Sequence, residues 1–74
     1  MKNNLKIARV LVDLTQQQLA EKVGVTRQTI SLIEQGKYNP SLRLCLNICY
    51  AVGKTLDEVF WINEEGNENE VTKN

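Results

Sequence analysis

The chain contains no histidine and only two cysteines, one proline, one tryptophan and one phenylalanine. It therefore lacks the side chain that enzymes use most often as a general base, and it lacks the four nitrogen or sulfur ligands of a structural zinc site. It also has no glycine-rich phosphate loop and no pair of acids set among apolar residues. We therefore do not expect an enzyme. We also expect no metal site, no cofactor and no small-molecule ligand.

Long hydrophobic runs are missing as well. No segment approaches the roughly 20 apolar residues of a membrane-spanning helix. Three polar residues follow Met1, and the apolar residues after them are periodic, unlike those of a signal peptide. The sequence thus predicts a cytoplasmic protein of one domain. A core in a chain of 74 residues rarely supplies more than about 3–5 kcal/mol, so tight helix packing, a partner subunit, or both are expected.

The net charge is zero, but the charges are unevenly distributed along the chain. Residues 1–54 carry eight Lys or Arg and three acids, a net charge of +5, whereas residues 55–74 carry one Lys and six acids, a net charge of −5. A basic body favours a phosphate-bearing partner; the alternative is ordinary solvated surface with an acidic tail. Residues 63–74 are almost devoid of apolar side chains and are predicted to be disordered.

Apolar periodicity and capping residues predict five helices. The first runs from about Leu5 to Asp13 with Asn3 or Asn4 as its N-cap. Its predicted core stripe is Leu5, Ala8 and Val12, with Ile7 and Leu11 beside it, and its predicted solvent-facing residues are Lys6, Arg9 and Asp13.

Polar residues that suit helix N-termini precede each later helix. Thr15 with Gln18, and Thr55 with Glu58, have the spacing of capping boxes. Thr26 and Ser41 are the predicted N-caps of the two helices between them. Gly24, Gly36 and Gly53 are predicted to end the second, third and fourth helices.

Apolar residues of the later helices define the rest of the predicted core. They are Leu19, Ala20, Val23, Ile30, Ile33, the apolar residues of 42–52 other than Tyr50, Leu56, Val59 and Phe60. Cys45 and Cys49 share one helix face at i, i+4 and are expected to be buried as small hydrophobic side chains. Trp61 and Ile62 are predicted to form a short strand or a turn.

The segment 15–36 resembles the helix-turn-helix of the phage-repressor/Cro family, also called XRE-type regulators. The residues that carry this resemblance are Gln16, Leu19, Ala20, Gly24, Val25, Ile30, Ile33, Glu34 and Gly36. The stretches TRQTI (26–30) and KYNPSL (37–42) are similar to short bacterial members. The resemblance covers about residues 4–62 and implies an all-α, five-helix lambda-repressor-like DNA-binding domain at 1–62.

The resemblance also implies a role for individual residues in binding double-stranded DNA. The helix that follows Thr26 would read bases in the major groove with Arg27, Gln28, Thr29, Ser31 and Leu32. Arginine can pair with guanine and glutamine with adenine, which supports this independently. Leu32 either contacts a thymine methyl group or packs at the rim. Phosphate contacts would come from Thr15, Gln16, Gln17, Thr26, Lys37, Tyr38, Asn39 and Arg43. Glu34 is expected to pair within the fold.

Family members bind as two-fold dimers, and an apolar cluster near the C-terminal end suits such an interface. Its predicted residues are Tyr50, Val59, Phe60, Trp61 and Ile62; in the alternative, Trp61 packs into the core. The predicted function is a homodimeric, sequence-specific transcriptional regulator, a repressor, that reads a two-fold symmetric operator. An antitoxin-type DNA-binding protein and a protein-interaction module are the alternatives.

Overall fold

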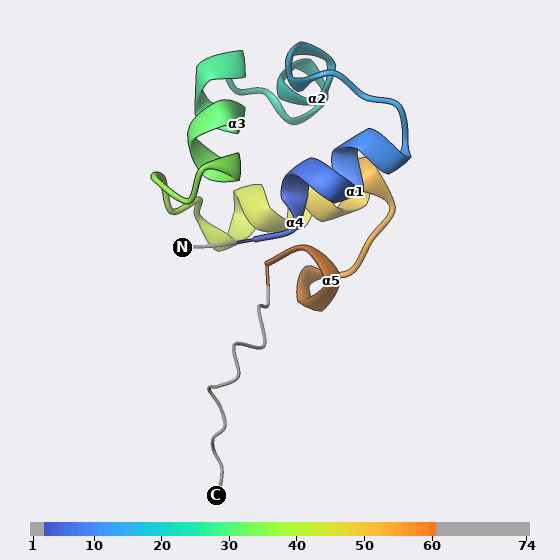
Figure 1. Cartoon of the computed structure of the whole chain (residues 1–74). Helices are drawn as coiled ribbons and strands as arrows, with labels where there is room; N and C mark the ends of the chain where they lie inside the picture. Colours follow the sequence, from blue (N-terminus) through green and yellow to red (C-terminus); the bar gives the residue numbers. More distant parts are fainter. Residues whose placement is uncertain (1–2, 61–74) are drawn as a thin grey trace, which may run out of the picture.

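Five helices form the computed structural model, which describes residues 3–60 (Figure 1). They are α1 (Leu5–Leu11), α2 (Gln16–Val23), α3 (Arg27–Glu34), α4 (Leu42–Val52) and α5 (Leu56–Phe60). No strand occurs between residues 3 and 60, and the predicted all-α class is confirmed. The predicted strand or turn at Trp61 and Ile62 and the tail 63–74 lie outside the described residues. No helix in the described part is long and apolar enough to cross a membrane.

The predicted caps are present and fix where the helices begin. Thr15 and Gln18 form a complete capping box, in which the Thr15 hydroxyl accepts from the Gln18 amide at 3.0 Å. The same arrangement joins Thr55 and Glu58 at the start of α5. Its hydrogen bonds from Thr55 lower the pKa of the Glu58 carboxyl. Short-range sequence pattern therefore sets these helix starts.

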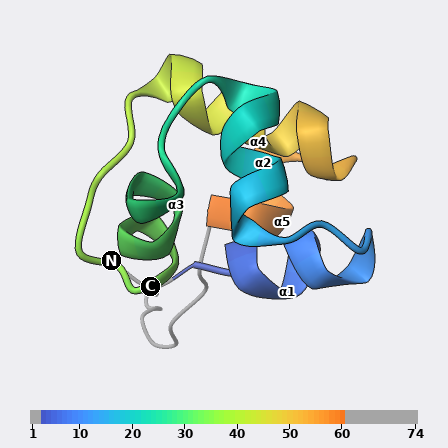
Figure 2. The ribbon, with the colours of Figure 1, turned by 90° about the horizontal axis from the view of Figure 1, so that it is seen from above.

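One core joins all five helices. α4 crosses behind α1 and packs against α2 and α5, while α2 packs mainly against α3 (Figures 1 and 2). The fully buried large side chains of this core are Leu5, Leu19, Ile30, Ile33, Ile48, Val52 and Val59. Cys45 and Cys49 are unpaired and buried as predicted. Burial raises the pKa of both thiols.

The first helix ends two residues earlier than the sequence predicts. Val12 leaves the helical conformation, and Asp13 has a φ of 60°, in the left-handed region that Asp adopts more readily than most residues. The Asp13 amide donates to the carbonyl of Val10 at 3.0 Å, which closes the final turn. The predicted extension to Asp13 is therefore wrong.

The side chains of α1 are also distributed differently from the prediction. Leu5 and Ala8 are buried as expected, but Ile7, Leu11 and Val12 are 63%, 67% and 41% exposed. Arg9 was expected to face water and is instead buried. Only one narrow side of this short helix packs against the core, and the Arg9 side chain lies on that side.

Asparagines tie the start of the described chain to two distant helices. The Asn3 side chain accepts from the Leu5 amide at 3.0 Å and donates to the Ile33 carbonyl at 2.7 Å. Asn4 occupies the N-cap position without a side-chain cap; its amide and side chain donate to the carbonyls of Val59 and Glu58. Both asparagines therefore hold the N-terminal end of α1. Asn3, not Asn4, supplies the side-chain oxygen that accepts from the first backbone amide of the helix.

Gly24 ends α2 in the left-handed conformation, with a φ of 78° and no atom within 4 Å of an added Cβ. Gly24→Ala should therefore destabilise the protein by about 1–2 kcal/mol through backbone strain alone. Gly24→Asn should cost less, because asparagine tolerates this conformation. Thermal and urea unfolding of both variants measure the difference. Equal losses would contradict a purely conformational cause.

Candidate nucleic-acid interface

Two helices meet at a tight turn and present one end of α3 to solvent. Ala20 and Ile30 are fully buried where α2 and α3 pack together. The amides of Gly24 and Val25 both donate to the Ala20 carbonyl, at 2.9 and 3.0 Å, which holds the turn against the end of α2. The crossing of α2 and α3 is thus fixed by buried contacts and by the turn.

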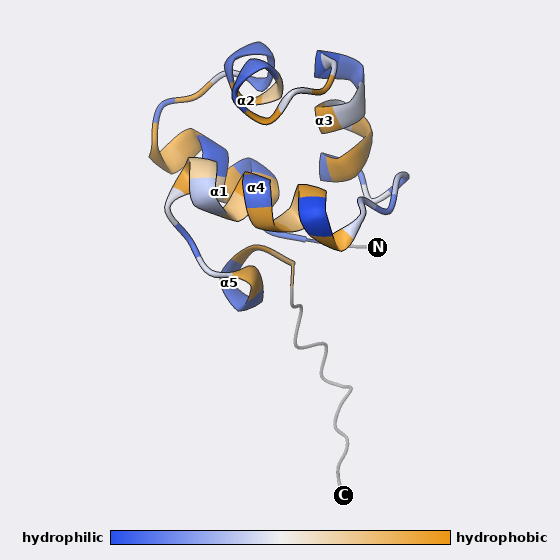
Figure 3. Cartoon of the chain, turned by 180° about the vertical axis from the view of Figure 1, so that it is seen from behind, coloured by the Kyte–Doolittle hydropathy of each residue, from blue (hydrophilic) through white to orange (hydrophobic). Residues whose placement is uncertain are grey.

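The first turn of α3 is polar and accessible. Arg27 and Gln28 are exposed, and the start of α3 is coloured hydrophilic in Figure 3. Thr26 caps the helix, since its hydroxyl accepts from the Thr29 amide at 3.2 Å and lies 3.0 Å from the Thr29 hydroxyl. Thr29 is half-buried, so this pair holds its side chain against the cap.

The next turn of α3 is less accessible than its first. Ser31 and Leu32 are both half-buried. The Ser31 hydroxyl accepts from the Gln35 side chain at 2.9 Å. Of the five predicted base-reading residues, Arg27 and Gln28 are therefore the two whose side chains are most freely available.

A hydrogen-bonded chain joins Arg27 to the interior. The Arg27 guanidinium donates to Gln16 Oε1 at 3.2 Å, and Gln16 Nε2 donates to Glu34 Oε1 at 3.0 Å. Gln16 is the first residue of α2, whereas Arg27 and Glu34 are the first and last residues of α3. One amide side chain thus bridges both ends of α3. Sequence reasoning placed Gln16 at the surface but did not find this bridge.

Glu34 pairs within the fold, as the sequence predicts. Arg9 Nε donates to Glu34 Oε2 at 2.6 Å and Nη2 donates to Oε1 at 3.3 Å. The third contact runs from Arg9 Nη1 to the Leu14 carbonyl at 2.7 Å. The two side chains are only 10% and 6% exposed. This ion pair therefore connects α1, the α1–α2 loop and the end of α3.

The start of α2 has the geometry of an anion site. The capping box uses the amides of Thr15 and Gln18. The amides of Gln16 and Gln17 hold the first two positions of the helix, which have no partner within an α-helix. Together with the helix dipole, such amides favour an anion. Gln17 is exposed, and its side chain donates to Glu21 at 3.0 Å.

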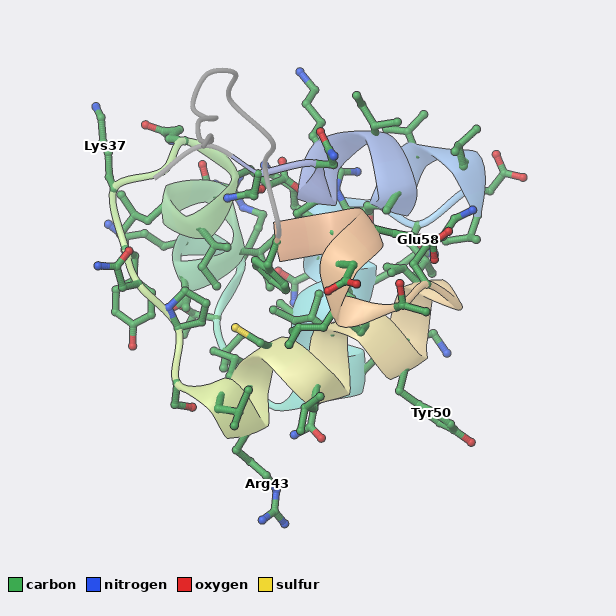
Figure 4. All side chains as sticks on the ribbon, turned by 90° about the horizontal axis from the view of Figure 1, so that it is seen from below. Lys37, Arg43, Tyr50 and Glu58 are labelled. Atoms are coloured by element: carbon green, nitrogen blue, oxygen red, sulfur yellow. The ribbon has the colours of Figure 1, made fainter. Side chains whose placement is uncertain are left out.

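The loop between α3 and α4 supplies the remaining predicted phosphate contacts. Lys37, Tyr38 and Asn39 are all exposed, with Tyr38 at 46%. Arg43 is exposed in the first turn of α4. In Figure 4, Lys37 and Arg43 extend away from the bundle in different directions, so the two cations do not converge on one point.

The predicted dimer residues differ in burial and in position. Val59 is fully buried, so its side chain has no surface to offer a partner and that assignment is wrong. Phe60 is half-buried beside a hollow of about 310 Å³, which is lined by Pro40, Leu42, Cys45, Leu56, Asp57 and Phe60. Trp61 and Ile62 lie outside the described residues.

Tyr50 lies apart from Phe60. Its side chain is 91% exposed and lines a second hollow of about 370 Å³ with Lys22, Asn47 and Ala51. It extends outward in Figure 4. Leu42, which the sequence placed in the core, is 65% exposed beside Phe60 instead. Leu42 and Leu56 are therefore the interface candidates that sequence reasoning missed, because helix periodicity alone does not show which side of α4 is covered.

Two helices joined by a tight turn, with a polar first turn on the second, define a helix-turn-helix protein. The Helix-turn-helix family model matches residues 5–59, and the chain belongs to this XRE-type family. It is 49% identical over 65 residues to the uncharacterized HTH-type transcriptional regulator YgzD of Bacillus subtilis, covering 88% of this chain and 98% of that protein. It is also 52% identical over 60 residues to the uncharacterized HTH-type transcriptional regulator MJ0272 of Methanocaldococcus jannaschii, covering 81% and 91%.

Solved structures show the same arrangement. The restriction-modification controller protein C.AhdI from Aeromonas hydrophila is similar with a TM-score of 0.70 and 29% identity, over 74% of this chain and 83% of that one. The clp gene regulator ClgR from Corynebacterium glutamicum is similar with a TM-score of 0.68 and 29% identity. That match covers 70% of this chain and 55% of the ClgR chain.

Glu34→Gln should destabilise the fold by about 3 kcal/mol, because it leaves the buried Arg9 charge uncompensated. Glu21→Gln is the matched control: Glu21 is exposed and accepts a hydrogen bond from the exposed Gln17, so its loss should cost less than about 0.5 kcal/mol. Urea unfolding followed by circular dichroism measures both. Similar losses in the two variants would show that the ion pair does not hold the helices together.

Proposed function

We propose that the chain is a sequence-specific DNA-binding transcriptional regulator that reads bases in the major groove with α3. The observation that carries this proposal is the exposed Arg27–Gln28 pair at the start of α3, with Arg27 held by Gln16. Arginine can donate two hydrogen bonds to guanine and glutamine can pair with adenine. An arginine already restrained by Gln16 loses less freedom when it binds.

Phosphate contacts on either side of α3 would set its position. The free amides of Gln16 and Gln17 would bind the backbone on one side. Lys37, Tyr38 and Asn39 would bind it on the other side, where all three are exposed. Such contacts position a protein on the duplex but carry no sequence information.

A homodimer would supply two reading helices. We place its interface at the hollow beside Leu42, Leu56 and Phe60, because this surface is apolar and adjoins the end of α5. Two copies related by a two-fold axis would place their α3 helices about 34–36 Å apart, one turn of DNA. The operator would then be two-fold symmetric. By occupying a promoter, the dimer would act as a repressor.

Selection of bound sequences from a random DNA pool tests specificity and symmetry together. Two inverted half-sites are expected to emerge. Recovery of sequences without a shared motif would overturn sequence-specific recognition.

Arg27→Ala and Lys37→Ala should separate reading from positioning. Arg27→Ala should cost about 1–3 kcal/mol on the selected operator and relax the preference at one base pair of each half-site. Lys37→Ala should weaken all sequences alike and lower the salt slope by about 1. Fluorescence anisotropy over a salt series measures both effects. If the two variants behave alike, Arg27 is not a reading residue.

Leu42→Glu should weaken the dimer, because it brings two carboxylates into an apolar interface. Leu42 is 65% exposed, so the fold itself should be retained. Sedimentation velocity and thermal unfolding measure the two properties separately. Tyr50→Ala is the control at the other end of α4 and should leave the dimer unchanged.

A further inference from the structure

The outer face of α1 is apolar and takes no part in the proposed DNA or Leu42 contacts. Ile7, Val10 and Leu11 are 63%, 54% and 67% exposed. Their spacing of i, i+3 and i+4 places them on one face of the helix. Nothing among residues 3–60 covers them. We refer to these three residues as the α1 face.

The α1 face borders a hollow of about 280 Å³. Its lining residues are Asn4, Ile7, Ala8, Leu11, Lys54 and Glu58. Lys54 and Glu58 carry opposite charges. The same hollow on a second copy would therefore present one charge of each sign, without net repulsion.

Charged residues mark the two ends of the α1 face. Lys6 lies at i, i+4 to Val10 and is exposed. Asp13 is exposed just beyond the last turn, with its amide bonded to the Val10 carbonyl. The helix thus has a cation at its start and an anion at its end, with apolar side chains between them.

This distribution complements itself when the helix direction is reversed. If two α1 helices pack antiparallel across a two-fold axis, Lys6 of each copy lies beside Asp13 of the other. The apolar side chains then meet in the middle, and the helix dipoles run in opposite directions. A two-fold contact needs a surface that complements itself.

We propose that the α1 face binds the α1 face of a second copy in this antiparallel arrangement. Its apolar side chains supply the binding energy, whereas Lys6 and Asp13 fix the register, since exposed charge pairs add specificity more than affinity. This surface is separate from the hollow beside Leu42. One chain can therefore use both and join two dimers.

The position of α1 also suits DNA binding, a point that rests on the proposed function. In Figure 2, α3 lies at the left of the bundle and α1 at its lower right, and the two helices pack against each other. Two dimers on adjacent operators could then contact each other through α1 while their α3 helices stay in the grooves. Such contact would make occupation of the two operators cooperative.

Sedimentation velocity of the full chain without DNA tests the contact directly. Over a concentration series, the wild type should assemble beyond two chains. Leu11→Glu and Leu42→Glu should each stop at two chains, because each variant retains one of the two surfaces. Leu11→Glu should weaken the dimer-to-tetramer step by about tenfold or more, since it brings carboxylates into an apolar contact. An unchanged tetramer in Leu11→Glu would overturn the proposal.

Reversal of the charges tests the antiparallel register. Lys6→Glu places two acids together and should weaken the tetramer, whereas Lys6→Glu combined with Asp13→Lys should restore it. A merely structural effect would not be rescued by the second change. Should the left-handed Asp13 position not tolerate lysine, Lys6→Gln serves as the comparison, and it should weaken the tetramer less than Lys6→Glu. Equal tetramers in Lys6→Glu and the wild type would exclude this register.

DNA binding supplies a readout that keeps the two proposals apart. On a fragment with two adjacent operators, Leu11→Glu should lose cooperativity and keep the wild-type affinity for a single operator. Loss of single-operator binding would mean that α1 serves DNA binding itself and would overturn the proposal. If the chain has no DNA preference at all, the proposed function fails, and sedimentation still decides the α1 contact.

Discussion

The buried ion pair between Arg9 and Glu34 is the interaction on which the rest of the structure depends. It joins α1 to the end of α3, and through the Leu14 carbonyl it also holds the α1–α2 loop. Burial of two charges is costly unless their hydrogen bonds are satisfied. Here Arg9 and Gln16 donate three hydrogen bonds to the Glu34 carboxylate, and Arg9 donates a fourth to the Leu14 carbonyl. Together these bonds orient α1, α2 and α3 relative to one another.

Local features of the fold could be predicted from the sequence because they depend on neighbouring residues. The capping pairs Thr15–Gln18 and Thr55–Glu58 need only a spacing of three, and both are present. The end of α2 at Gly24 likewise follows from a single residue type. The pairing of Glu34 within the fold was also predicted, although its partner was not. That partner lies 25 positions away in the sequence.

Features that depend on packing at a distance could not be predicted in this way. Helix periodicity assigned Arg9 to the solvent side, yet the ion pair with Glu34 makes its burial possible. Periodicity marked Ile7, Leu11 and Leu42 as apolar without showing which helix sides the small core would cover. Tyr50 and Phe60 were grouped by composition, whereas the turns of α4 place Tyr50 beside a different hollow. Exposure of Arg27 and Gln28 at the start of α3 could be predicted, because the polar first turn of that helix follows directly from the sequence.

The bridge through Gln16 has a consequence for how recognition can diverge among related chains. Its amide oxygen accepts from Arg27 while its nitrogen donates to Glu34, so both ends of this side chain are already engaged. A residue without a donor at position 27 would break this link and release the Gln16 side chain from its bridging position. The repertoire of sequences open to this scaffold is therefore restricted by a residue at the start of α2, and redesign of its specificity would have to treat positions 16 and 27 as a unit.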